Sequence, residues 1–321
     1  MVKLARWTDG DEPFDGFVDG ETVWALSDGS TTLDLVRRGL AATLKVAAAT
    51  IGHGEGRPLV HVELRTPLDP PSVRDFVAFE QHVEGVAVAM GHGGVVPEWY
   101  EAPTFYFTNP HTLRATGEEI PVPAGCEVLD LEAEVAVVVG GGTDDDGRSL
   151  DPERAATRIF GFTVFNDWSA RDLQRREMKV SLGPAKGKDF AGTLGPWIVT
   201  ADELADRVGP DGFHDLPVRA EINGEVLGED TTAHMGWTFA ELVTYASADS
   251  RVVPGDVLGS GTAGGGCLAE LWGRRGEQVP PPLTEGDEVR VVVDGIGEVV
   301  NRVGARRAGS QLIPARNRRT P

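Results

Sequence analysis

Short hydrophobic runs separated by Asp-Gly pairs dominate the first part of the chain. The runs lie at residues 4–7, 14–18 and 22–26. Because Asp-Gly pairs favour tight turns and each run is only four or five residues long, we expect three short strands there. Hydrophobic residues then recur at helical spacing from Thr32 to about Ala49, which predicts one helix.

A group of prolines follows this region. Pro67, Pro70 and Pro71 restrict their own backbone and that of the residue before each of them, so they indicate a boundary. The expected division is a small N-terminal domain at 1–66, a larger domain at 67–305 and a basic C-terminal tail at 306–321.

The segment after the prolines has a helical pattern. Asp75, Phe79, His82 and Val86 fall at i, i+4, i+7 and i+11, so a helix starting near Ser72 would present an acid and an imidazole on one face. A plainer interpretation is that Ser72 and Asp75 form the capping box of that helix. Both interpretations predict helix from about residue 72 onward.

Two later hydrophobic runs predict strands that carry acids. Residues 131–139 are rich in β-branched side chains, and the two-residue period of a strand places Glu132 and Glu134 on one face. The run at 159–165 leads to Asp167, which could supply a third carboxylate. A buried ionised carboxylate is costly unless a cation or hydrogen bonds compensate it. These acids therefore indicate a metal site, unless they face solvent on a half-exposed antiparallel sheet.

Composition and short motifs exclude several classes of partner. The 321 residues are 40% hydrophobic, enough for a core, and the formal net charge of −20 argues against nucleic acid and anionic membranes, which require basic patches. Two cysteines, Cys126 and Cys267, and an opening without a secretory pattern predict a cytoplasmic protein without disulfides. No hydrophobic stretch approaches the roughly 18 residues of a membrane span. The G-x-G-x-x-G at 259–264 is followed by more glycines instead of a helix, so no dinucleotide site is expected.

Three further segments carry a family resemblance. They are LDLEAE at 129–134, NDWSARDLQ at 166–174 and GPAKGKDF at 183–190. In this order and spacing they resemble the fumarylacetoacetate hydrolase family, over roughly residues 70 to 305. The resemblance implies an α+β fold, with a catalytic domain built on a rolled β-sheet and a small N-terminal domain, and it implies a homodimer.

The resemblance also implies a divalent cation held by four carboxylates. The matching residues are Asp75, Glu132, Glu134 and Asp167. Ligation by oxygen alone favours Mg²⁺, or Mn²⁺ or Ca²⁺, over zinc or copper. A hard cation with open positions can chelate the two oxygens of a 1,3-diketone or a 2-oxo acid and stabilise the enolate formed when a C–C bond breaks.

Six further residues match positions with roles in the family. His82 lies seven residues after Asp75 and would be the general base, Glu270 would orient it, and Lys188 would stabilise developing negative charge. The expected substrate contacts are Tyr106, Gln174 and Thr262. Without the resemblance, His82 would be read as a structural histidine and Lys188 as a solvated loop residue.

The predicted reaction is hydrolysis of a C–C bond in a 1,3-diketo acid such as fumarylacetoacetate or an acylpyruvate. A decarboxylase, hydratase or tautomerase of a 2-oxo acid could use the same cation, and this alternative stays open. A non-catalytic protein that binds a metal and an oxo acid would need no base, so the pair His82 and Glu270 argues against it.

Three departures from the family pattern bear on specificity. Gly91 stands where fumarylacetoacetases carry an arginine, Val77 replaces an aromatic residue, and Met178 replaces a tyrosine. A guanidinium recognises a carboxylate through two hydrogen bonds, which glycine cannot supply. We therefore expect fumarylacetoacetate to be a poorer substrate than a shorter or apolar diketo acid, unless Arg114 or Arg175 reaches the pocket.

Overall fold

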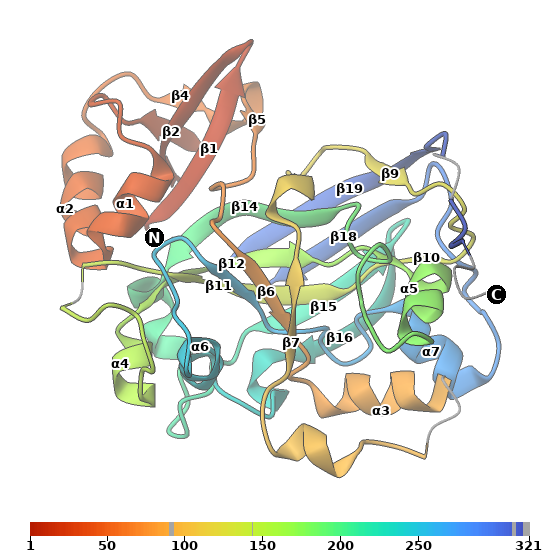
Figure 1. The fold of residues 1–321 in the computed structure, drawn as a ribbon. Helices are drawn as coiled ribbons and strands as arrows, with labels where there is room; N and C mark the ends of the chain where they lie inside the picture. Colours follow the sequence, from red (N-terminus) through yellow and green to blue (C-terminus); the bar gives the residue numbers. More distant parts are fainter. Residues whose placement is uncertain (90–92, 143, 310–312, 317–321) are drawn as a thin grey trace.

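The computed structural model describes the whole chain except residues 90–92, 143, 310–312 and 317–321 (Figure 1). Its largest sheet has twelve strands within this described part. In spatial order they are β4 (Arg57–Pro58), β3 (Thr22–Ala25), β2 (Glu12–Asp19), β1 (Lys3–Asp9), β14 (Gly192–Thr200), β12 (Ile159–Asn166), β11 (Ala133–Val139), β17 (Val257–Gly259), β6 (Val73–Phe76) and β7 (Phe105–Thr108), with β5 (Glu63–Leu64) beside β1 and β8 (Leu113–Arg114) beside β14.

The remaining strands form two smaller sheets. A five-stranded sheet has the order β16 (Glu225–Thr231), β15 (Pro217–Ile222), β18 (Glu288–Val293), β19 (Gly297–Arg306) and β9 (Ile120–Val122), while β10 (Leu129–Asp130) pairs with β13 (Ser169–Ala170). The α-helices are α1 (Thr32–Arg38), α2 (Leu40–Thr50), α3 (Glu80–Ala89), α4 (Pro152–Ala156), α5 (Arg171–Met178), α6 (Phe239–Ser247) and α7 (Leu268–Arg275). Short 3₁₀ turns lie at 59–61, 97–100, 110–112, 201–207 and 232–234.

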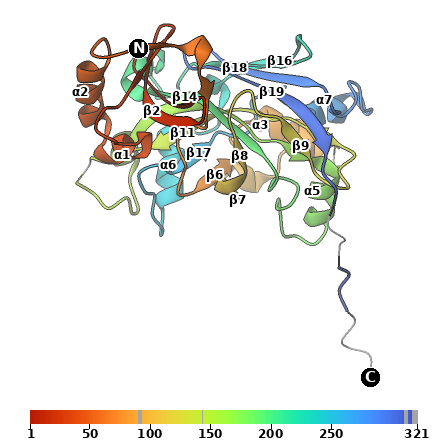
Figure 2. The same cartoon turned by 90° about the horizontal axis from the view of Figure 1, so that it is seen from above.

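The main core lies between the twelve-stranded and the five-stranded sheets. β19 runs beside β14 in both views of the molecule (Figures 1 and 2). Val135 and Val137 on β11, Phe162 on β12, Val291 on β18 and Val299 on β19 are all buried in this layer. Each such side chain stabilises the fold by about 1.5 to 3 kcal/mol because it leaves water. The alternating valines of β11 and β18 thus help to build the α+β architecture that the resemblance implies.

The N-terminal residues form three strands at the predicted positions and extend the large sheet. β1 pairs antiparallel with β2 and, through Lys3 and Leu4, with β14. Figure 1 shows these strands with α1 and α2 at one end of the molecule. The division at residue 66 remains a prediction, since the sheet continues across it.

The single helix expected from Thr32 to Ala49 is wrong, because two helices meet at Gly39. Gly39 ends α1 and begins α2 with a φ of 87°, a conformation that favours glycine. A Cβ atom there would lie 2.4 Å from the carbonyl oxygen of Gly141. The chain therefore turns where another backbone segment approaches closely, and hydrophobic periodicity does not register this.

The helix expected from Ser72 is also wrong over its first half. Residues 73–76 form β6, parallel to β17 and antiparallel to β7, and helix begins only at Glu80. Ser72 makes no capping box with Asp75, because its hydroxyl donates to Asp256 at 2.9 Å. Two strands distant in sequence thus override the local helical spacing.

Candidate metal centre and active site

Four carboxylates on or directly next to three strands of the large sheet converge at one point. Asp75 lies in β6, Glu134 lies in β11, and Glu132 and Asp167 lie at the ends of β11 and β12. One oxygen from each of the four lies within 4.8 Å of the others. The exposed fractions of these four residues are at most 6%, so the alternative of solvent-facing acids is wrong. The adjacency of β12, β11, β17 and β6 brings these acids together.

Gly259 allows this approach, because β17 separates the strands that carry Asp75 and Glu134. A Cβ atom on Gly259 would lie 2.5 Å from Oδ1 of Asp75 and 2.9 Å from Oε2 of Glu134. The first glycine of the G-x-G-x-x-G segment thus makes room for carboxylates.

Burial raises the pKa of three of these acids. It does so for Asp75, Glu134 and Asp167, and mutual repulsion adds to the increase for Asp75 and Glu134. Oδ1 of Asp75, Oε1 of Glu134 and Oδ1 of Asp167 are buried and have no hydrogen-bond partner among the residues that the structure describes. Buried oxygens are rarely left unpartnered. A cluster of hard anionic oxygens with free lone pairs fits a divalent cation such as Mg²⁺, Mn²⁺ or Ca²⁺.

Two buried cations border the cluster. Nζ of Lys188 pairs with Glu132 and Asp167, and the guanidinium of Arg171 lies 2.7 Å from both Asp130 and Glu132. Burial opposes the ionisation of Glu132, but the charges of Arg171 and Lys188 outweigh it and hold the pKa of this carboxyl well below its usual range. Glu132 therefore stays anionic although its neighbours tend to take up protons.

His82 lies on α3 between Glu132 and Glu270. Its Nε2 is 3.9 Å from Oε1 of Glu132, and its Nδ1 is 3.7 Å from Oε2 of Glu270 on α7. The Glu270 carboxylate is fixed by Arg274 and by the backbone N–H of Gly265, which donates to Oε2 at 2.7 Å. The predicted base and its predicted orienting acid are thus neighbours, with the imidazole next to the four carboxylates.

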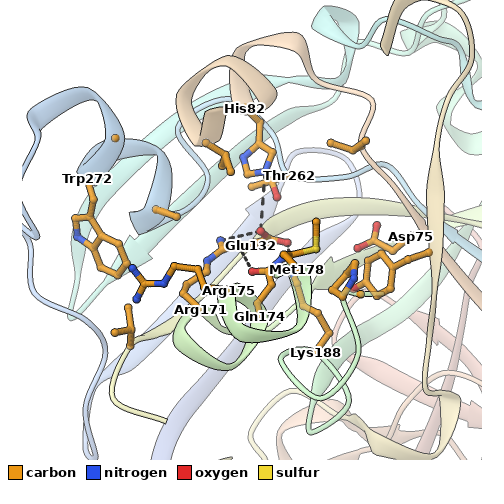
Figure 3. A pocket seen from close by; sticks show the side chains of 18 of the residues that line it. Asp75, His82, Glu132, Arg171, Gln174, Arg175, Met178, Lys188, Thr262 and Trp272 are labelled. Carbon is orange, nitrogen blue, oxygen red and sulfur yellow. Dashed lines mark hydrogen bonds and ion pairs between the residues drawn. The ribbon is translucent and has the colours of Figure 1, made fainter. Parts of the chain in front are cut away.

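A cavity of about 650 Å³ opens onto these groups. Figure 3 shows His82 and Thr262 on one side of Glu132, and Gln174 and Lys188 on the other. Tyr106 also lines the cavity, and its hydroxyl donates to Asp167. All ten residues predicted from the resemblance therefore lie in or beside one site.

The comparisons with known proteins decide the family. Residues 72–304 match the family model described as fumarylacetoacetate (FAA) hydrolase, C-terminal. The chain belongs to the fumarylacetoacetate hydrolase family. It is 30% identical over 293 residues to the fumarylacetoacetase of Mus musculus, with 75% of this chain and 69% of that protein covered.

Other members of the family carry different names. The chain is 29% identical over 251 residues to oxaloacetate tautomerase YisK of Bacillus subtilis (strain 168), with 77% and 74% covered. The crystal structure of 5-carboxymethyl-2-hydroxymuconate delta-isomerase from Mycobacterium smegmatis has a TM-score of 0.69 at 25% identity and covers 95% of this chain and 100% of its own. The expected family and its α+β fold are confirmed, whereas the reaction differs between relatives.

The predicted departures from the family pattern can be placed in part. Val77 and Met178 line the cavity, and Gly91 lies outside the described residues. Arg175 also lines the cavity, while Arg114 pairs with Glu118 at 3.1 Å. Arg175 therefore reaches the pocket. The expectation that fumarylacetoacetate is a poorer substrate applied only if neither Arg114 nor Arg175 did so, and it no longer follows from Gly91.

Sequence reasoning missed two residues of the site. Arg171 belongs to the 166–174 motif, so its place in that motif was a signal for its role next to Glu132. Cys267 is fully buried, and its sulfur lies 3.7 Å from Nδ1 of His82. Because 185 residues separate this pair, no local pattern could have revealed it.

None of the helices in the described part of the chain combines the length and the hydrophobicity that a membrane span requires.

Proposed function

We propose that this protein hydrolyses a C–C bond in a 1,3-diketo acid with the help of a divalent cation, Mg²⁺ or alternatively Mn²⁺ or Ca²⁺. The observation that carries the proposal is the position of His82, which lies between Glu270 and the four carboxylates at the wall of a cavity. A base next to a cation site is the arrangement that activation of water requires.

The cation would be held by the four clustered acids. Three of them have unpartnered buried oxygens that a cation would satisfy, and these are Asp75, Glu134 and Asp167. Glu132, the fourth, already accepts from Lys188 and forms an ion pair with Arg171. When bound, the cation supplies positive charge that stabilises the negative charge developing on the carbonyl oxygens of the substrate.

The chain's own residues perform the proton transfers. Nε2 of His82 takes a proton from a water molecule, and the carboxylates of Glu270 and Glu132 stabilise the imidazolium that forms. Lys188 places a fixed ammonium beside the reacting oxygens, where it stabilises the negative charge that develops on them. Tyr106, Gln174 and Thr262 would orient the substrate.

An enzyme that decarboxylates, hydrates or tautomerises a 2-oxo acid is the alternative. Similarity to an oxaloacetate tautomerase favours it, because the same acids would serve such a reaction. Tautomerisation, however, needs no water as a nucleophile, whereas His82 held by Glu270 is suited to water activation. The base therefore favours hydrolysis.

Product analysis separates these reactions. The Mg²⁺-loaded protein is incubated with acylpyruvates, fumarylacetoacetate, oxaloacetate and an unsaturated 2-oxo acid, and the products are followed by NMR. Hydrolysis gives two acids from one diketo acid, and both should form about 100-fold more slowly, or not at all, in His82→Asn. A parent protein that leaves every diketo acid intact but converts oxaloacetate would overturn the proposal in favour of the alternative.

We also propose that the protein forms a homodimer. Light scattering on the purified protein tests this.

A further inference from the structure

A second cluster of metal-binding groups lies beside the acids within the described part of the chain. Nδ1 of His82, Sγ of Cys267 and one carboxylate oxygen of Glu270 lie within 4.8 Å of one another. The sulfur and Oε2 of Glu270 are each 3.7 Å from Nδ1. All three side chains are buried, and His82 also lines the cavity, so a small ion can reach the cluster from there.

Two of the three separations come close to those of tetrahedral zinc, and the third, between the sulfur and the Glu270 carboxylate, is within 4.8 Å. Zinc bonds of about 2.3 Å to sulfur and about 2.0 to 2.1 Å to nitrogen or carboxylate oxygen place tetrahedral ligands roughly 3.4 to 3.6 Å apart. The observed separations of 3.7 Å need contraction of only a few tenths of an ångström. The ligand types are also those that select zinc over Mg²⁺, since a thiolate and an imidazole are softer than carboxylates.

The surroundings orient these ligands. Arg274 holds one oxygen of Glu270, and the Gly265 N–H holds the other. Nδ1 of His82 faces the sulfur and Glu270, so a metal ion on Nδ1 would leave the ring proton on Nε2, which faces Glu132 at 3.9 Å. A histidine that binds zinc usually donates its second N–H to a carboxylate in this way.

We propose that His82, Cys267 and Glu270 form a binding site for zinc, distinct from the four-carboxylate site, and that zinc there inhibits the enzyme. On binding, the Cys267 thiol releases its proton to solvent, and the ion accepts lone pairs from Sγ, Nδ1 and a Glu270 oxygen; no electron is transferred. The fourth position is left for water. Inhibition rests on the proposed function, because zinc bound to Nδ1 and Glu270 would end the contact between the general base and the acid that orients it. Binding does not rest on it.

Cobalt(II) is the probe for binding, because a thiolate ligand gives it an intense near-ultraviolet charge-transfer band that carboxylate ligands do not give. The Mg²⁺-saturated protein is titrated with Co²⁺ and then with Zn²⁺, and the same is done with Cys267→Ser and Cys267→Ala. Cys126→Ser is the matched control, since Cys126 is the other buried thiol and lies outside the cluster. Circular dichroism and melting temperature confirm that each variant is folded.

We expect one equivalent of Co²⁺ to give the band in the parent and in Cys126→Ser, to give none in either Cys267 variant, and to be displaced by Zn²⁺. In activity assays, with each inhibited rate divided by the same variant's rate in Mg²⁺ alone, Cys267→Ser should need at least tenfold more Zn²⁺ than the parent for half inhibition. A folded parent without the thiolate band overturns the site. Equal Zn²⁺ inhibition of parent and Cys267→Ser, with the band present, overturns only the inhibitory role. If no substrate is turned over, the proposed function fails while the band still decides the site.

Discussion

Replacement of Glu134 by glutamine should make the metal-free protein more stable. Glu134 lies within 4.8 Å of three other carboxylates, and two charges at that separation repel by about 3 kcal/mol at an effective dielectric constant of roughly 20. Glutamine keeps the shape and can donate to Asp75. Because partial protonation already relieves some of the repulsion, we expect the free energy of unfolding to rise by about 1 to 3 kcal/mol, or the melting temperature by about 2 to 6 °C.

The same substitution should weaken stabilisation by metal. A cation at about 100 times its Kd stabilises the parent by about 2.7 kcal/mol, which corresponds to roughly 5 °C. The variant lacks one anionic ligand, so its increase should be less than half as large at the same concentration. Differential scanning calorimetry in EDTA, and then in Mg²⁺ or Mn²⁺, measures both effects. Glu225→Gln, an exposed acid on β16, is the control and should change neither.

The effect should depend on pH in a defined direction. Burial raises the folded-state pKa of Asp75, Glu134 and Asp167, so the folded metal-free protein binds more protons than the unfolded chain above about pH 4. Its stability is therefore fully present below that pH and falls as pH rises through the folded-state pKa values. The advantage of Glu134→Gln should grow with pH. A folded variant that melts at or below the parent in EDTA at pH 8 would refute this reasoning.

Three further predictions concern catalysis, specificity and acid stability. His82→Asn should lower kcat by about 100-fold or more with unchanged Mg²⁺ affinity, and Glu270→Gln should lower kcat less. Steady-state kinetics measures kcat and calorimetric titration measures the Mg²⁺ affinity. A parent-like kcat in His82→Asn would show that His82 is not the general base. Arg175→Met should lower kcat/KM by about 10- to 100-fold for a diketo acid with a distal carboxylate, because this substrate loses a charge-assisted hydrogen bond. The kcat/KM for an apolar acylpyruvate should stay unchanged. Equal losses for both substrates would contradict this. Burial lowers the pKa of His214 to about 4, whereas the same side chain in the unfolded protein takes up a proton near pH 6.5. The free energy of unfolding should therefore fall by about 2 to 3 kcal/mol as the pH drops from 6.5 to 4, because only the unfolded chain gains the proton in this range. Urea melts should show this loss reduced in His214→Phe but retained in the exposed-site control His111→Gln; an unchanged loss in His214→Phe would show that another group is responsible.

Sequence reasoning succeeded for acids that follow strong strand patterns. Residues 133–139 and 159–166 are long β-branched or aromatic runs, so Glu134 could be assigned to a strand and Asp167 to a strand end from the sequence alone. Their convergence followed from the family motif, because the order of strands in a sheet is not written in any local pattern. Burial of all four acids is a property of that order.

The segment around Asp75 shows why the rest could not be predicted. A strand, a loop and a helix happen to place Asp75, Phe79 and His82 at helical spacing. Residues 73–76 form a strand because β17 pairs with them from about 185 positions away along the chain. The cluster around Cys267 depends on the same kind of long-range contact, since 185 residues separate Cys267 from His82 and the packing of α7 on α3 brings them together.

The same buried acids that would bind a cation also destabilise the metal-free fold, so one substitution changes both the stability and the response to metal. A group of buried acids with unpartnered oxygens destabilises the metal-free fold, and nothing in packing requires it. If the cluster were only structural, Glu134→Gln would be neutral or harmful in EDTA and would leave the response to metal unchanged. If the cluster serves a cation, the same variant gains stability and loses the metal response. His82→Asn should behave differently from Glu134→Gln, because the imidazole lies outside the acid cluster. Its loss should lower turnover without changing the stabilisation by Mg²⁺ or Mn²⁺.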